Sequence, residues 1–238
     1  AGNAAVTVNG NVKMNNGEEW AVDGKQGSFG YYDAVGIYAT SNMGPNSMGA
    51  QVVVNGDVDM KVLGNGMFTN AGGSTIDTKG DVAVEVKKDN TKGYAALRAE
   101  DGVVNVNVVK DGSGKVTGAD SHKVNLKGNV AVTTGAVNSV DTKGTLSAVN
   151  LGLSTADSSL HGVVYNAFKD EGKVQQGVTF TGESNLVLEN GATWTNEKYG
   201  ITGESWGGEA FAGSKVTTFT GGSDAASAGL ILQKDKNP

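Results

Sequence analysis

Apolar and polar residues alternate one by one over short stretches of this chain, and valine fills many of the apolar positions. Clear examples are residues 82–86, 104–108, 130–132 and 186–188. A period of two places apolar side chains on one face of a strand and polar side chains on the other. Glycine, asparagine, aspartate and lysine bound these stretches, as is typical of turns between strands. The pattern therefore predicts an all-β chain.

Residues 94–100 are the stretch in which a helix is the nearest alternative, because they combine three alanines with leucine, arginine and glutamate. The stretch is followed by Asp101 and Gly102 and then by another alternating segment. Its own residues also fit alternation, with Tyr94 and Ala96 on one face. We therefore expect a strand here.

A short motif of glycine, asparagine or aspartate, valine, any residue, and methionine or valine recurs along the chain. It lies within residues 8–14, 54–60, 78–84 and 126–132. When Gly102 is added, the glycines at 56, 80, 102 and 128 follow one another at intervals of about two dozen residues. A seven-residue phrase also occurs almost twice, at 74–80 and 138–144. Repeats of this length are typical of arrays in which each unit buries its apolar face against its neighbours.

Two architectures use short strands at this spacing, a meander of antiparallel hairpins and a stack of coils with two or three strands each. The repeat favours the stack, because equivalent residues of successive coils then lie about 4.8 Å apart. We expect a right-handed parallel β-helix that forms one elongated domain over residues 1–238, with roughly ten coils and a length of about 50 Å. Departures from the repeat predict protruding loops near 40–49 and 110–123.

Composition narrows the choice of partners. The chain has 37 glycines but only 2 prolines, which fits many tight turns between ordered strands. Its formal charge of -6 and the lack of a run of basic residues argue against nucleic acid and anionic membranes as partners. Arg98 is the only arginine, so bidentate capture of an anion is possible at one place at most. The chain has no cysteine, and no apolar run approaches the roughly 20 residues of a membrane span.

Several stretches resemble the passenger domains of type V autotransporter adhesins of Gram-negative bacteria, of the pertactin-like class. They are residues 36–39 (Gly-Ile-Tyr-Ala), 93–102, 160–166 and 186–196. The resemblance implies a β-helical fold, export, and display on the bacterial surface. In this family a C-terminal β-barrel in the outer membrane carries the passenger, and the resemblance would place that barrel after Pro238. We expect the chain to be a fragment of a longer array.

A β-helical polysaccharide lyase or hydrolase is the main alternative. Such enzymes need a compact set of carboxylates with a basic residue, and the acidic residues here are scattered. Asp57 and Asp59 share a face of one strand, as do Asp81 and Glu85, and we expect both pairs to be solvated.

The two histidines, His122 and His161, are isolated from any Gly-x-Ser-x-Gly motif, although a solenoid can bring distant residues together. We find no motif for a metal or a cofactor and expect none.

Aromatic residues are the best candidates for a binding site. Tyr31, Tyr32 and Trp206 are the candidates for exposed anchors, Trp206 foremost because two glycines beside it indicate an exposed turn, and packing on the coil or under a loop is the alternative for all three. Packing is the expected role of Trp194, and stacking within a coil that of Tyr38. The asparagine-rich turns predict ladders of side chains between coils.

Together these observations predict a non-enzymatic fragment of a surface adhesin. Its partner would be a glycan or protein of a host or neighbouring bacterial cell, or a second copy of the chain. The sequence leaves open two alternatives, the carbohydrate-active enzyme and a stalk that only holds a binding segment away from the cell.

Overall fold

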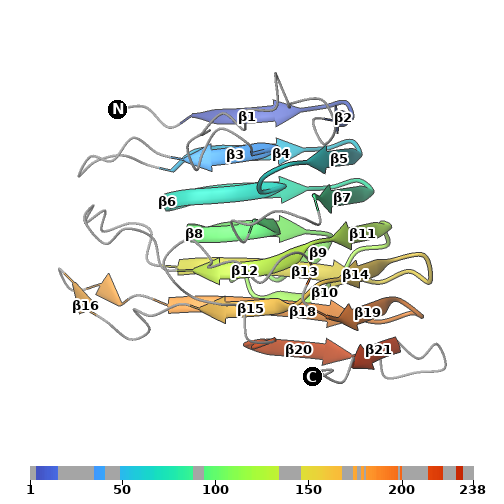
Figure 1. Cartoon of the computed structure of the whole chain (residues 1–238). Coiled ribbons are helices and arrows are strands. Elements are labelled where there is room, and N and C mark those ends of the chain that lie inside the picture. The colour runs from blue at the N-terminus through green and yellow to red at the C-terminus, as the bar shows by residue number, and fades with distance from the viewer. Residues whose placement is uncertain are drawn as a thin grey trace, which may run out of the picture.

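The structure is a computed structural model, and it describes residues 4–15, 35–40, 49–87, 94–133, 146–167, 174–175, 178–179, 181–197, 199, 214–221 and 229–232. Strands lie one above another, from the blue N-terminal end to the red C-terminal end (Figure 1). No helix occurs in these ranges, so the expected all-β class is confirmed there. In residues 94–100 a helix was the alternative to the expected strand, and all of them except Tyr94 lie in strand β8 (Ala95–Val106).

Most strands belong to two parallel sheets, which we divide into three columns. Column 1 contains β1 (Ala5–Val8), β4 (Gln51–Val54), the second halves of β6 (Met67–Thr78) and β8, β13 (Leu146–Leu153), β18 (Thr181–Leu188) and β20 (Thr218–Gly221). Column 2 contains β2 (Val12–Asn15), β5 (Val58–Val62), β7 (Val82–Val86), β11 (Val124–Lys127), β14 (Ser159–His161), β19 (Thr193–Asn196) and β21 (Gly229–Leu232). Column 3 contains β3 (Ile37–Thr40), the first halves of β6 and β8, β12 (Asn129–Thr133) and β15 (Val164–Ala167).

From β1 to β19 the chain passes through columns 1, 2 and 3 in that order and then begins again, apart from two short hairpins. Within a column each strand pairs in parallel with the strand of the neighbouring layer, and the inner strands do so on both sides. Among the described residues, the sheet of column 2 has 7 strands. The expectation of roughly ten coils is therefore too high for this part of the chain. At about 4.8 Å per step, the described layers span about 30 Å.

Two long strands turn from column 3 into column 1 without a loop. Pairing between β6 and β8 is interrupted between Asn70 and Ser74. Gly73 has a φ of 72° and Asp101 a φ of 55°, so both adopt the left-handed conformation. The Asp101 N–H donates to Ser147 Oγ of the next layer at 3.0 Å. Local backbone geometry and a cross-layer hydrogen bond thus hold this bend.

The core lies between the columns and is built from their inward-facing apolar side chains. Column 2 supplies Val58, Met60, Val84, Leu126 and Leu160, all nearly inaccessible to solvent. Trp194 is also buried, and its Nε1–H donates to the Gly162 carbonyl at 2.8 Å. The expectation that Trp194 packs in the core is therefore confirmed.

The corner between columns 1 and 2 requires glycine in successive layers. A Cβ on Gly56 would lie 2.6 Å from the backbone of Gly10, and a Cβ on Gly80 would lie 2.6 Å from the Gly56 carbonyl oxygen. No side chain fits between layers at these distances. Three copies of the sequence motif therefore stack on one another here.

The asparagine or aspartate of the motif links these corners. Asn11 Oδ1 accepts the N–H of Asp57 at 2.9 Å, and Asp57 Oδ1 accepts the N–H of Asp81 at 3.0 Å. Asp81 Oδ1 accepts the N–H of Lys123 at 2.9 Å. Each side chain thus satisfies a backbone donor of the next layer, which no strand pairing reaches at the corner.

The alignment of the motif is wrong at two positions. Gly102 pairs with Ser74 at the start of column 1, directly after the bend at Asp101, and marks no corner between columns 1 and 2. Gly128 lies between columns 2 and 3, in contact with Gly162 of the following layer. A tight turn occurs both between columns 1 and 2 and between columns 2 and 3, so the glycine of the motif is found at either corner. The second copy of the longer phrase, 138–144, lies outside the described residues.

A hairpin of β9 (Val108–Lys110) and β10 (Val116–Ala119) separates β8 from β11. Its turn is held by Asp111 Oδ1, which accepts Ser113 Oγ–H at 2.6 Å, Ser113 N–H at 2.8 Å and Lys115 N–H at 3.1 Å. A smaller antiparallel pair joins β16 (Val174–Gln175) to β17 (Val178–Thr179). Residues 41–48, most of the other loop expected from the sequence, lie outside the described residues.

Candidate functional site

The outward side of column 2 presents an accessible polar surface, which we call the polar face. Strand β5 shows how it arises, because Val58, Met60 and Val62 are buried while Asp59 and Lys61 are exposed. The same alternation continues in the neighbouring strands. The polar face consists of Lys13, Asn15, Asp59, Lys61, Glu85, Asn125, Lys127, Ser159, His161, Thr193 and Thr195.

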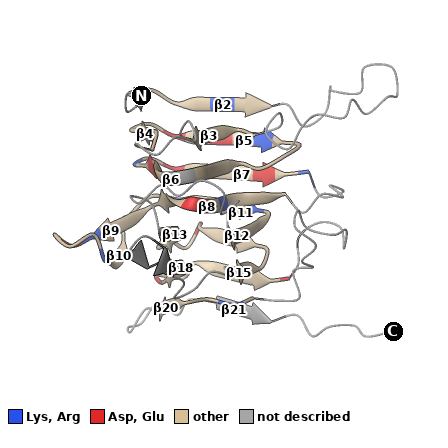
Figure 2. Cartoon of the chain, turned by 90° about the vertical axis from the view of Figure 1, so that its left-hand side faces the viewer, with Lys and Arg blue, Asp and Glu red and all other residues tan. Residues whose placement is uncertain are grey.

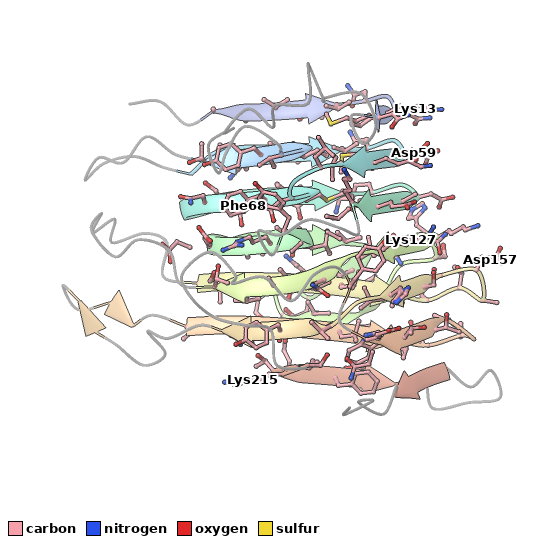
Figure 3. All side chains as sticks on the ribbon, in the orientation of Figure 1. Lys13, Asp59, Phe68, Lys127, Asp157 and Lys215 are labelled. Carbon is pink, nitrogen blue, oxygen red and sulfur yellow. The ribbon has the colours of Figure 1, made fainter. Side chains whose placement is uncertain are left out.

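Opposite charges meet across layers in the N-terminal half of the polar face. Lys13 Nζ lies 4.0 Å from Asp59 Oδ2, and Lys127 Nζ lies 3.3 Å from Glu85 Oε2. Lys13, Asp59 and Lys127 lie along the same side of the stack (Figure 3). Figure 2 shows this succession of charges, with basic residues on β2, acidic and basic residues on β5, and acidic residues on β7. The side chains of Lys13 and Lys127 are 82% and 59% exposed, so water screens both pairs.

The next layers carry neutral hydrogen-bonding groups. Ser159 Oγ–H donates to Asn125 Oδ1 at 2.8 Å across β11 and β14. Thr193 and Thr195 follow in register on β19. Both lie at the surface with partial exposure. These groups can exchange hydrogen bonds with a polar ligand without moving the backbone.

His161 marks the C-terminal part of the polar face. Its Nε2 lies 3.3 Å from Glu197 Oε2, and its ring meets the ring of Tyr199 edge-on at 5.2 Å between centroids. Tyr199 is anchored by Asn129, whose Oδ1 accepts the Tyr199 N–H and whose Nδ2–H donates to the Tyr199 carbonyl. Burial, and then the charge of Glu85, raise the pKa of the Tyr199 hydroxyl.

Neither histidine forms part of a catalytic triad within the described residues. His122 Nδ1 lies 3.6 Å from Asp81 Oδ1, and His161 lies against Glu197. No hydrogen bond joins either ring to a serine hydroxyl in the described ranges. The carboxylate of Asp81 is already used at the corner, where it accepts the Lys123 N–H.

Polar residues on the outer side of column 1 differ from the polar face because the two central ones, Asn105 and Asn150, are buried, while Asp77 and Asn185 at the ends are partly exposed. Asn105 Nδ2–H donates to Asp77 Oδ1 at 2.7 Å, Asn150 Nδ2–H to Asn105 Oδ1 at 2.7 Å, and Asn185 Nδ2–H to Asn150 Oδ1 at 2.8 Å. We call these four residues the asparagine ladder. Asn105 and Asn150 are each 5% exposed. Side-chain ladders between layers were expected in the turns, where Asn55 Nδ2–H does donate to Asn9 Oδ1 at 2.8 Å, and the longer asparagine ladder lies on strands.

Arg98 and Glu100 form a buried ion pair on the outer side of column 3. Arg98 Nε and Nη2 donate to Glu100 Oε1 at 2.9 and 2.5 Å. Glu100 also accepts hydrogen bonds from Asn70 Nδ2 and Thr133 Oγ1, each at 3.0 Å. The guanidinium carbon lies 5.7 Å from the centroid of the Phe68 ring. The guanidinium of the chain's only arginine is therefore directed at a carboxylate of its own strand and packs on an aromatic ring of the neighbouring layer.

The aromatic residues expected to bind a ligand, Tyr31, Tyr32 and Trp206, lie outside the described residues. Tyr38 stacks on Phe68 of the next layer, with ring centroids 5.3 Å apart, as expected. The residues of the polar face were not singled out from the sequence as a site. Their signal was present in the polar positions of the alternating stretches, but the pairing of strands is needed to place them on one surface.

Among the described residues, no group of three or more side chains is placed to hold a metal ion. Within the same ranges, no helix is long and apolar enough to cross a membrane. No family model, curated protein or solved structure matches the chain.

Proposed function

We propose that this chain is a segment of a right-handed parallel β-helix with three strands per turn, and that it acts as a non-enzymatic adhesin of the autotransporter passenger type. The passage of the chain through columns 1, 2 and 3 in constant order supports the helical path. The sequence stretches that resemble autotransporter passengers support display on a bacterial surface.

The observation that carries the binding role is the polar face. It is accessible over successive layers, and its ion pairs have exposed members. A rigid sheet fixes the spacing of its groups at about 4.8 Å per layer, so a partner can contact several layers at once. Many modest contacts of this kind suit a glycan or a polar protein surface on another cell.

The test is binding of the purified chain to a glycan array and a panel of extracellular-matrix proteins. The variants are Lys127→Ala on the polar face, the pair Tyr31→Ala/Tyr32→Ala, and Trp206→Ala. Lys115→Ala is the matched control, because Lys115 is an exposed lysine of the hairpin, away from the polar face. We expect Lys127→Ala to weaken binding and Lys115→Ala to leave it unchanged.

Three results would contradict the proposal in different ways. Loss of binding only in the Tyr31/Tyr32 or Trp206 variants would move the site away from the polar face and keep the adhesin role. Silence on every ligand from a well-folded chain would favour a stalk. Cleavage of a polysaccharide would favour the carbohydrate-active enzyme.

A further inference from the structure

Four Asn-Gly dipeptides lie among the described residues, at 9–10, 55–56, 65–66 and 190–191. This dipeptide is prone to spontaneous loss of ammonia, because the glycine nitrogen can attack the asparagine side-chain carbonyl without steric hindrance from a Cβ. The reaction needs an accessible asparagine and a glycine N–H that is not engaged elsewhere. Two of these dipeptides, Asn65–Gly66 and Asn9–Gly10, differ by both criteria.

The dipeptide Asn65–Gly66 is protected. Asn65 is 0% exposed, and its Oδ1 accepts the Ala95 N–H at 2.9 Å. The Gly66 N–H, which would have to attack, donates to the Ala95 carbonyl at 3.0 Å. Reaction there requires a local opening that breaks the contact between two layers.

The dipeptide Asn9–Gly10 has the opposite surroundings. Both residues are exposed, and an added Cβ on Gly10 would meet nothing within 4 Å. In the part of the chain that the structure describes, the Gly10 N–H makes no hydrogen bond. The nitrogen is thus available as a nucleophile in the folded state.

A neighbouring layer also prepares the carbonyl of Asn9 for attack. Asn55 Nδ2–H donates to Asn9 Oδ1 at 2.8 Å. A hydrogen bond to this oxygen draws electrons from Cγ and stabilises the negative charge that develops on Oδ1 when the nucleophile adds. This donor belongs to the next copy of the same motif.

We propose that Asn9–Gly10 is a site of spontaneous deamidation, assisted by the side chain of Asn55. The Gly10 nitrogen loses its proton and bonds to Asn9 Cγ, the bond from Cγ to the side-chain nitrogen breaks, and ammonia leaves. Water then opens the cyclic imide at one of its two carbonyls and gives aspartate or isoaspartate. The isoaspartate product inserts one methylene group into the backbone between β1 and β2, and either product adds a negative charge beside Asn55.

The test is peptide mapping by mass spectrometry of the purified full chain after incubation at mildly alkaline pH, with separation of aspartate from isoaspartate. Asn65–Gly66 is the internal control, since it is the same dipeptide in the same molecule. We expect deamidation at Asn9 to be at least about tenfold faster than at Asn65 in the folded chain. In denaturant the two rates should become similar.

Two variants test the assigned roles. Gly10→Ala fits the open space at this position and should slow the reaction at Asn9. Asn55→Ala removes the donor and should slow Asn9 severalfold in the folded chain, with no effect in denaturant. Equal rates at Asn9 and Asn65 in the folded chain would overturn the site, and an Asn9 rate unchanged by Asn55→Ala would overturn the role of Asn55.

Discussion

The asparagine ladder of column 1 and the polar face of column 2 both carry polar side chains from layer to layer, but they differ in exposure. In the ladder, side-chain amides donate over 2.7–2.8 Å to a neighbouring amide or to the Asp77 carboxylate, and the central amides of Asn105 and Asn150 are almost inaccessible. On the polar face, the charged groups are longer, more separated and open to water. Similar spacing of polar residues in the strands thus produces two kinds of surface.

The difference in burial assigns different roles to the two sets. A buried amide that loses its partner keeps the cost of its lost hydration, whereas an exposed group is solvated again. The buried residues are therefore needed for stability. Exposed ion pairs contribute little to folding, which leaves the polar face available for contacts with a partner.

The largest effect is expected from the buried pair in column 3. Arg98→Met should destabilise the fold by about 3–5 kcal/mol, because it leaves the Glu100 carboxylate without its guanidinium in a buried position. The free energy of unfolding from urea titration measures this. A cost below about 1 kcal/mol would mean that water reaches Glu100 and that this outer side is not buried as described.

The asparagine ladder offers a matched pair of substitutions. Asn150→Ala removes both a donor to Asn105 and an acceptor for Asn185, and we expect a loss of about 1–3 kcal/mol. Asn125→Ala on the polar face removes an acceptor for Ser159, which is partly exposed, and should cost less than about 1 kcal/mol. Equal losses in the two variants, measured by the same urea titration, would show that burial does not set the cost of losing these hydrogen bonds.

An exposed group can still hold local structure when several donors converge on it. Hydrogen bonds from the Ser113 side chain, and then from the backbone of Ser113 and Lys115, lower the pKa of the Asp111 carboxyl. Because the pKa is lowered in the folded state, the ionised carboxylate stabilises the hairpin fully at pH values above the usual aspartate pKa of about 3.9. This contribution is lost as the pH falls through the lowered pKa.

The expected sign can be followed by NMR of the amide groups of Val109 and Gly118, which pair across the hairpin. Their signals should move toward unstructured values as the pH falls through the folded-state pKa of Asp111. In Asp111→Ala the hairpin should be loosened already, with no such transition. A transition that persists in Asp111→Ala would assign the pH dependence to another group.

Alternation predicted the strands at 82–86, 130–132 and 186–188, whereas the stretch 104–108 is broken at Asn107, which has a φ of 53°. The near-repeats predicted that segments such as β4 and β6 are neighbours. The repeat failed at Gly102 and Gly128 because glycine answers a local need, a tight turn or a close approach, which occurs at more than one corner of each layer. Local sequence does not record which corner a turn occupies. That depends on pairings between segments far apart in the chain.

The candidate site was harder to predict for the same reason. Asp59 was expected to be solvated, and it is, but its pairing with Lys13 depends on the register between β2 and β5. Arg98 stood out as the only arginine, yet its buried partner Glu100 lies two residues away on the same strand, where sequence alone does not reveal that both are covered. Burial of outward-facing residues is a property of the whole fold.

The smallest effect on stability is expected on the polar face, and it gives the sharpest test of the comparison. Lys127→Ala removes a pair with Glu85 whose lysine is 59% exposed, so the free energy of unfolding should change by about 0.5 kcal/mol or less. The charge exchange Glu85→Lys/Lys127→Glu should also fold with near-original stability, because the pair is kept with its polarity reversed.

Binding should respond differently, since a partner that meets this face would then encounter the opposite order of charges. We expect the exchange to weaken binding at low salt and to have less effect at high salt, where exposed charges are screened. Loss of stability without loss of binding would make the polar face part of the scaffold and would place recognition elsewhere on the chain.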